Sequence, residues 1–374
     1  IGKNREFKKS IEKYWKDGDY KSLDSSLFDI QKEMINTYQA SGIDRYPQNE
    51  MTGYDNMFDT AIMAGIYNPK DTEEYYDMCR GADALEMTKW FNTNYHYLVP
   101  EISNDTEFKL NWDSVNKYSK WYQKPLYLIG PYTFLKLSKG SFDFESKLME
   151  LTNIYLELLT QKGSSYSNFH LDEPAFVMDT TTEEIEMIKK VYNRLAEANV
   201  EINVFTYYED VEWLEEFVNL PVNGIGLDFV NGRNNFKNLQ SIGFPKDKTL
   251  FVGLVDGINV WKTNIRYAVN TLDRLSKWTD NLVVTNAGPL YHLPVTLKGE
   301  SQLSYFLYEN LSFATEKLQE LNDIKNKDYT KYSTNIGSDD KNVQDRINNL
   351  KDDDFVKRLD VTERRKLQDE ILNL

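Results

Sequence analysis

The first forty residues carry apolar side chains at helical spacing. Phe7, Ile11 and Tyr14 recur every three or four positions, which places them on one face of a helix. The pattern predicts an amphipathic helix from Arg5 to Trp15, with charged side chains on a neighbouring face. By the same criterion we predict a second long helix from Ser25 to Ala40.

Beyond residue 120 the pattern changes to short apolar runs separated by amphipathic helical stretches. The predicted strands are Leu126 to Gly130, Phe169 to Asp172, Ile202 to Thr206, Gly226 to Val230, Leu250 to Leu254 and Leu282 to Asn286. The predicted helices between them include Phe144 to Gln161, Thr182 to Ala198 and Ile265 to Lys277. Strands and helices that alternate in this way are typical of a parallel sheet with helices outside it.

The number of strands favours an α/β fold of the (β/α)8 TIM-barrel type. One more strand near residue 90 and one just upstream of Ile1 would complete the barrel. A doubly wound sheet is the alternative, but no glycine-rich nucleotide-binding motif follows any predicted strand. We therefore predict a barrel domain at 1–325. The remainder, 326–374, is rich in Asp and Lys, which predicts a polar linker with a final helix from Thr362 to Leu374.

Composition and charge exclude several classes of protein. Among 374 residues there are 59 Asp and Glu against 44 Lys and Arg, so the net charge is −15. A mean field of that sign repels phosphate backbones and anionic lipid, and we expect neither a nucleic-acid nor a membrane partner. No segment approaches the roughly 20 apolar residues that cross a bilayer, and one cysteine cannot form an internal disulfide. These features predict a soluble, cytoplasmic protein without a signal peptide.

Polar residues follow several predicted strands, where a barrel keeps its reactive groups. Asp172 and Glu173 would form an acid and base couple if burial raised one pKa. Adjacent strand residues face opposite sides, however, so a simpler alternative is that one carboxylate binds loop amides and the other faces a helix. An alternative function is a free-standing glycoside hydrolase. It would need one of these acids opposite Glu209 or Asp228, with the carboxyl groups about 5 to 9.5 Å apart.

The supply of soft metal ligands is small. His96, His170 and His292 lie far apart in the sequence, and no spacing typical of a zinc site is present. Cys79 lies in an acidic stretch with helical character, and no serine-nucleophile motif occurs, so we predict a buried, unreactive thiol. The sequence therefore predicts no metal ligand and no catalytic residue in this chain.

Basic side chains near aromatic ones stand out against the acidic background. Arg5 and Lys8 share a helix face, and Lys89 directly precedes Trp90 and Phe91. Such groups would suit an anionic, partly aromatic ligand. The alternative is that Arg5 and Lys8 only solvate the first helix.

Several motifs resemble those of one family, cobalamin-independent methionine synthase, in the N-terminal half of that enzyme. The most specific is the run Glu86-Met87-Thr88-Lys89-Trp90-Phe91-Asn92-Thr93-Asn94-Tyr95-His96-Tyr97, which is similar to a family signature almost letter for letter. Arg5-Glu6-Phe7-Lys8 is similar to the family's R-E-L-K helix, with Phe7 in place of Leu. The other similar segments are Gly130 to Leu135, Asp172 to Ala175, Asn259 to Trp261, where Ile258 replaces a preceding Arg, and Glu363 to Gln368. The last of these resembles the connector into a second barrel.

The resemblance implies that the full enzyme transfers a methyl group from polyglutamylated 5-methyltetrahydrofolate to homocysteine, which forms methionine. It also implies that zinc holds the homocysteine thiolate, with its ligands in a C-terminal catalytic barrel on the same or a separate chain. This half would bind and orient the folate through Arg5, Glu6, Phe7, Lys8 and Lys89. We therefore expect no cofactor within this chain and no catalysis by it alone. A barrel that binds folate polyglutamates without any partner is a further alternative.

Overall fold

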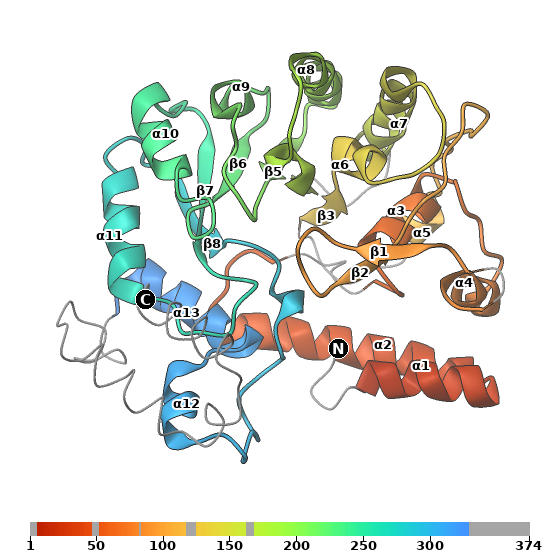
Figure 1. Ribbon diagram of the computed structural model, residues 1–374, viewed down its shortest axis with the longest axis horizontal. Coiled ribbons are helices and arrows are strands. Elements are labelled where there is room, and N and C mark those ends of the chain that lie inside the picture. The colour runs from red at the N-terminus through yellow and green to blue at the C-terminus, as the bar shows by residue number, and fades with distance from the viewer. Residues whose placement is uncertain (1–5, 47–51, 82–83, 117–124, 162–167, 329–374) are drawn as a thin grey trace, which may run out of the picture.

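The two N-terminal helices form where the apolar spacing predicts them. The computed structural model describes residues 6–46, 52–81, 84–116, 125–161 and 168–328. Helix α1 (Glu6–Asp17) packs along helix α2 (Tyr20–Ala40), as Figure 1 shows. The buried residues of α1 are Phe7, Ile11 and Tyr14. Asp19 begins α2, because its carboxylate accepts a hydrogen bond of 3.2 Å from the Ser22 backbone N–H.

Short elements connect these helices to the main sheet. They are α3 (Asn56–Met63), α4 (Thr72–Cys79), β1 (Met87–Lys89), β2 (His96–Leu98) and α5 (Trp112–Asn116). Strands β1 and β2 pair antiparallel in a two-stranded sheet of their own. The buried carboxylate of Asp55 accepts hydrogen bonds from the backbone N–H groups of Phe58 at 2.8 Å and Leu98 at 2.9 Å. One side chain therefore both starts α3 and joins it to β2.

The main sheet contains six parallel strands in the order of the sequence. They are β3 (Leu126–Ile129), β4 (Asn168–Asp172), β5 (Glu201–Phe205), β6 (Gly224–Asp228), β7 (Thr249–Val255) and β8 (Leu282–Asn286). Each of the six strands predicted from the sequence is confirmed, with no end shifted by more than two residues. Residues of β4 alternate between the two faces of the sheet. Phe169 and Leu171 are buried against the helices, whereas His170 and Asp172 lie on the opposite face.

Helices cover the outer side of the curved sheet (Figure 1). They are α6 (Pro131–Lys136), α7 (Phe144–Leu159), α8 (Thr182–Ala196), α9 (Leu214–Val218), α10 (Asn235–Ile242) and α11 (Ile265–Leu275). Two short 3-10 helices, η1 (Pro174–Val177) and η2 (Leu290–His292), follow β4 and β8, and the described part ends with α12 (Tyr305–Asn310) and α13 (Ala314–Asn326). Thr181 and Glu184 form a reciprocal capping box that fixes the start of α8. The three helices predicted between strands are confirmed, each ending slightly earlier than predicted, and α2 begins at Tyr20 rather than at the predicted Ser25.

The sheet supports the α/β prediction but does not show a closed barrel. Consecutive strands are neighbours throughout, whereas a doubly wound sheet reverses its strand order. The prediction of a barrel strand near residue 90 is wrong, because Met87–Lys89 belongs to the separate hairpin. All three of its residues are exposed, whereas a strand of a parallel barrel is buried on both faces.

The remaining predictions about chain organisation are only partly covered by the described residues. No helix among these residues is long and apolar enough to span a bilayer. Of the predicted polar extension at 326–374, the structure describes 326–328, so the predicted helix from Thr362 to Leu374 lies outside the described part.

Because Asp55 both starts α3 and joins it to β2, its removal should destabilise the protein unusually strongly. In Asp55→Ala, two buried N–H groups lose their acceptor, and we expect the free energy of unfolding to fall by about 2 to 4 kcal/mol. Asp71→Ala is the matched control. This exposed residue also starts a helix, α4, but accepts only from the Glu74 N–H, and its loss should cost about 1 kcal/mol. Urea denaturation measures both, and equal losses would contradict the joining role of Asp55.

Candidate functional site

The predicted folate-site residues of α1 divide between its exposed and its buried side. Lys8 is exposed, with 62% of its side chain accessible, and pairs with Glu12 at 3.6 Å. Glu6 is half-buried in the first turn. Phe7 is buried in an apolar cluster to which α2, α3, α4 and Leu98 of β2 also contribute, so its side chain anchors the helix in the protein interior. Arg5 lies outside the described residues.

Lys89 occupies the end of the exposed strand β1, opposite His96 of β2. The next residue, Trp90, turns the other way and is only 1% exposed. Because successive side chains point to opposite sides, the Lys89 side chain is accessible while the indole of Trp90 is buried and anchors the segment. The cluster containing Phe7 and Leu98 therefore brings α1 and the hairpin together, and each contributes an exposed lysine.

A cavity of about 560 Å³ reaches the inner face of the sheet. Asp172, at the end of β4, accepts hydrogen bonds there from the hydroxyls of Tyr127 and, at 2.7 Å, Tyr207. Burial raises the pKa of Asp172 to about 7, although both hydrogen bonds act in the opposite direction. His170 also lines this cavity and contacts the rings of Phe205 and Phe251, and burial lowers its pKa to about 3.

The lysines at the rim of this cavity are already paired with carboxylates. Lys325 lies 2.5 Å from Asp44, and Lys327 lies 2.6 Å from Asp273. They are therefore less available to an acidic ligand than Lys89.

The second acid of the pair, Glu173, supports the neighbouring helix. Its carboxylate accepts hydrogen bonds from the N–H groups of Tyr132 at 3.2 Å and Thr133 at 2.7 Å, at the start of α6. A Cβ on Gly130 would lie 2.2 Å from the Glu173 carboxyl carbon, so this approach requires glycine. Of the two acids, Glu173 is the one that faces a helix, because the amides that it binds belong to the first turn of α6. Asp172 points into the cavity and accepts from tyrosine hydroxyls, where the sequence predicted bonds from loop amides.

Asp228 is likewise occupied by its own loop. It accepts hydrogen bonds from the N–H groups of Val230 and Asn231, both at 2.7 Å, and from the Tyr208 N–H at 3.0 Å. Burial raises its pKa to about 6. Glu173 and Asp228 are thus positioned to stabilise loops rather than to face each other across a substrate.

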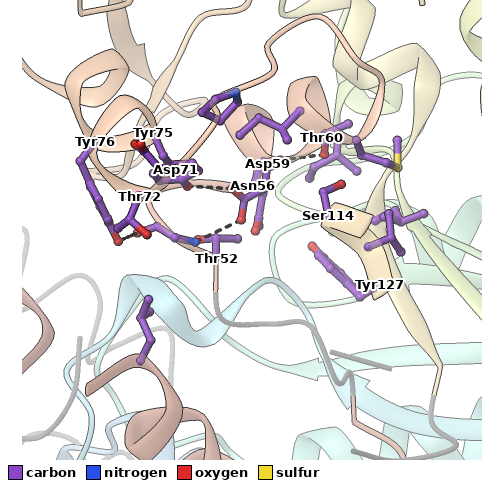
Figure 2. A pocket seen from close by; sticks show the side chains of 18 residues that line it. Thr52, Asn56, Asp59, Thr60, Asp71, Thr72, Tyr75, Tyr76, Ser114 and Tyr127 are labelled. Carbon is purple, nitrogen blue, oxygen red and sulfur yellow. Dashed lines mark hydrogen bonds between the residues drawn. The ribbon is translucent and has the colours of Figure 1, made fainter. Parts of the chain in front are cut away.

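A smaller cavity of about 330 Å³ lies between α3, α4 and β3 (Figure 2). Asp59 and Asp71 line it, and Asp59 accepts hydrogen bonds from the Tyr75 hydroxyl at 2.7 Å and the Gly53 N–H at 3.1 Å. Its lining, as far as the structure describes it, includes no Lys, Arg or His. A cavity of this charge does not suit an acidic ligand.

The histidines and the cysteine occupy four separate environments. His96 is exposed on β2, His170 lies between phenylalanines, and His292 bonds to Tyr208. Burial raises the pKa of the Cys79 thiol, in agreement with the predicted unreactive cysteine. No group of three or more His, Cys, Asp or Glu suited to a metal ion occurs in the described part of the chain. These residues therefore do not fit a zinc site.

Sequence reasoning missed the tyrosines that meet at the strand ends. Tyr207 follows β5 and Tyr127 lies on β3, and neither position carries a recognisable motif. The abundance of tyrosine, 25 residues, was the available signal, but it does not say which of them meet.

The raised pKa of Asp172 predicts a pH-dependent difference in stability. Between its usual pKa of 3.8 and about 7, the folded chain keeps a proton that the unfolded chain has lost. The stability of the protein relative to Asp172→Asn should therefore be greatest below pH 4 and fall as the pH rises to about 7, by at most about 1.4 kcal/mol per pH unit. Urea denaturation of both proteins from pH 4 to 8 measures this difference, and a flat profile would contradict it.

Comparisons with known proteins agree with the arrangement of motifs. Residues 1–280 match the family model described as cobalamin-independent synthase, N-terminal domain. The 5-methyltetrahydropteroyltriglutamate–homocysteine methyltransferase of Thermotoga maritima is 37% identical over 402 residues, covering 100% of this chain and 53% of that protein. The protein of the same name from Lactococcus lactis subsp. lactis is 33% identical over 413 residues, covering 100% of this chain and 54% of that protein. The chain spans about half the length of these curated relatives.

A solved structure shares the fold. It is a B12-independent methionine synthase from a Shewanella species in complex with selenomethionine, with a TM-score of 0.57 at 17% identity, covering 82% of this chain and 89% of that chain. The family model matches most of the sequence, and the relatives align over its full length. The chain belongs to the cobalamin-independent methionine synthases, as a homologue of their N-terminal domain.

Proposed function

We propose that this chain is the folate-side half of a 5-methyltetrahydropteroyltriglutamate–homocysteine methyltransferase, and that it binds and orients the methyl donor. The observation that carries the proposal is the alignment of the whole chain with one half of enzymes of that name. Binding that fixes the donor relative to its acceptor would accelerate methyl transfer without any covalent chemistry by this chain.

The exposed cations of α1 and the hairpin support a site for the acidic tail of the folate. Lys8 and Lys89 are both accessible, on elements that share one apolar cluster. Because the net charge of −15 repels a polyanion, binding a polyglutamate depends on local cations that form charge-assisted hydrogen bonds with its carboxylates. Arg5, directly before α1, and Glu6 complete the proposed site, and the packing of Phe7 holds α1 in place.

The acceptor side of the reaction is proposed to lie in another part of the enzyme. Zinc keeps a bound thiol in its nucleophilic thiolate form at neutral pH. Since the described residues do not fit a zinc site, we propose that the zinc ligands and the homocysteine pocket belong to a C-terminal barrel, on the same or a separate chain. The glycoside hydrolase alternative would need Asp172, the acid that faces the cavity, to lie opposite Glu209 or Asp228. It is less favoured, because backbone amides engage both Glu173 and Asp228.

Titration calorimetry with this chain tests the proposed role directly. The triglutamate form of 5-methyltetrahydrofolate should bind more tightly than the monoglutamate form, because only the longer tail supplies the additional carboxylates. The preference should weaken at high ionic strength. Equal and negligible heats for the two forms would argue against a folate role for this half on its own.

Lys89→Ala should weaken triglutamate binding by about tenfold, equivalent to about 1.4 kcal/mol, and leave monoglutamate binding nearly unchanged. Lys237→Ala is the matched control, since Lys237 is exposed on α10 and belongs to no proposed site. Calorimetry of both variants measures the effect. If the two variants bind the triglutamate form equally well, Lys89 is not part of the site.

A further inference from the structure

Three side chains from distant segments form one hydrogen-bond chain beside Lys89. The Trp90 indole Nε1–H donates to the Tyr208 hydroxyl oxygen at 3.1 Å, and that oxygen lies 2.7 Å from Nε2 of His292. Trp90 follows β1, Tyr208 follows β5, and His292 ends η2 after β8. These hydrogen bonds therefore connect the hairpin formed by β1 and β2 to two loops of the main sheet.

Only the Trp90 end of this hydrogen-bond chain has a fixed direction. Indole can only donate, so the Tyr208 oxygen accepts from Trp90. The direction of the bond between the Tyr208 hydroxyl and Nε2 of His292 is set by the histidine tautomer. Burial lowers the pKa of His292 to about 4, so the ring is neutral at physiological pH.

The backbone at this junction is held in an unfavourable conformation. Phe91 has a φ of 50° and Tyr208 a φ of 89°, in a region that bulky side chains rarely adopt. The two rings contact each other, with centroids 5.3 Å apart. The backbone of Tyr208 is also fixed, because its N–H donates to buried Asp228 at 3.0 Å. Strain of this kind persists only where surrounding contacts enforce it, and it is concentrated at functional sites.

The indole of Trp90 directly follows Lys89 in the sequence and restricts where Lys89 can lie. Lys89 lies on a strand whose three residues are all exposed and whose sheet partner is the equally short β2. Trp90 is almost fully buried and also packs against Tyr97 of β2, at 5.4 Å between ring centroids. The position of the indole therefore sets the position of the Lys89 backbone relative to the main sheet.

We propose that Tyr208 and His292 are positioning residues, which hold the Lys89 segment in the orientation that the acidic tail of the folate requires. The proposal rests on the proposed function and deepens it. It adds Tyr208 and His292 to the residues that determine the preference for a polyglutamate tail, although the loops that carry them contain none of the proposed binding cations.

Tyr208→Phe is the direct test, because it keeps the ring and removes the hydroxyl. Calorimetry should show triglutamate affinity reduced about threefold or more, with monoglutamate affinity unchanged. In the Lys89→Ala background the same substitution should have almost no further effect, because the group being positioned is already gone. Tyr192→Phe is the matched control, since it removes another buried tyrosine hydroxyl, bonded to Glu173 at 2.9 Å and remote in sequence from the hairpin.

Amide hydrogen exchange over residues 87–98 gives a readout that does not depend on the ligand. Exchange there should be faster in Tyr208→Phe than in Tyr192→Phe. Unchanged exchange, equal loss of mono- and triglutamate affinity, or full additivity with Lys89→Ala would each overturn the positioning role while the proposed function stands. If Lys89→Ala itself has no effect on triglutamate binding, Lys89 is not part of the site and this proposal fails, whereas the proposed function is still decided by the triglutamate preference of the unaltered chain.

Discussion

Buried carboxylates that accept backbone N–H bonds hold the loops of this protein in place. Asp55 joins α3 to β2, Glu173 starts α6, and Asp228 closes the loop after β6. Loops that are buried where parallel strands end expose amide groups that no ladder satisfies, and a buried carboxylate can accept several of them at once. These bonds only partly offset the desolvation of each acid, so burial still raises the pKa of all three carboxyl groups.

This constraint also decides what the acids do. A general acid or base must face a substrate atom, whereas these oxygen atoms face amides of the protein. The same residue types that suggest hydrolytic chemistry in the sequence are therefore used to build a rigid scaffold. Asp172 differs from these three acids, because its carboxylate faces the larger cavity and accepts from two tyrosine hydroxyls. The exposed lysines Lys8 and Lys89 are suited to recognition of an acidic ligand, which is the role proposed for this chain.

The sequence predicts the main sheet well and the hairpin poorly. Strands such as Leu250 to Leu254 are continuous apolar runs, and burial on both faces leaves few other interpretations. Met87–Lys89 has no such run, and the strand predicted near residue 90 rests only on the need to reach eight strands. Local patterns also cannot reveal the bond between Trp90 and Tyr208, whose residues are 118 positions apart. The family resemblance suggests Lys89 as a site residue, whereas the loops proposed to position it are brought beside it only by the folded chain.

The order of the strands has a consequence for how this chain reaches its native state. Consecutive strands of the main sheet pair with each other, so every ladder closes a loop that contains one or two α-helices. The entropy lost on closing a loop grows with its length, and contacts between close neighbours in sequence form fastest. The bond between the hairpin and the loop after β5 spans a much longer separation and needs Tyr208 already in its strained conformation. We therefore expect the sheet to assemble strand by strand and the hairpin to dock last.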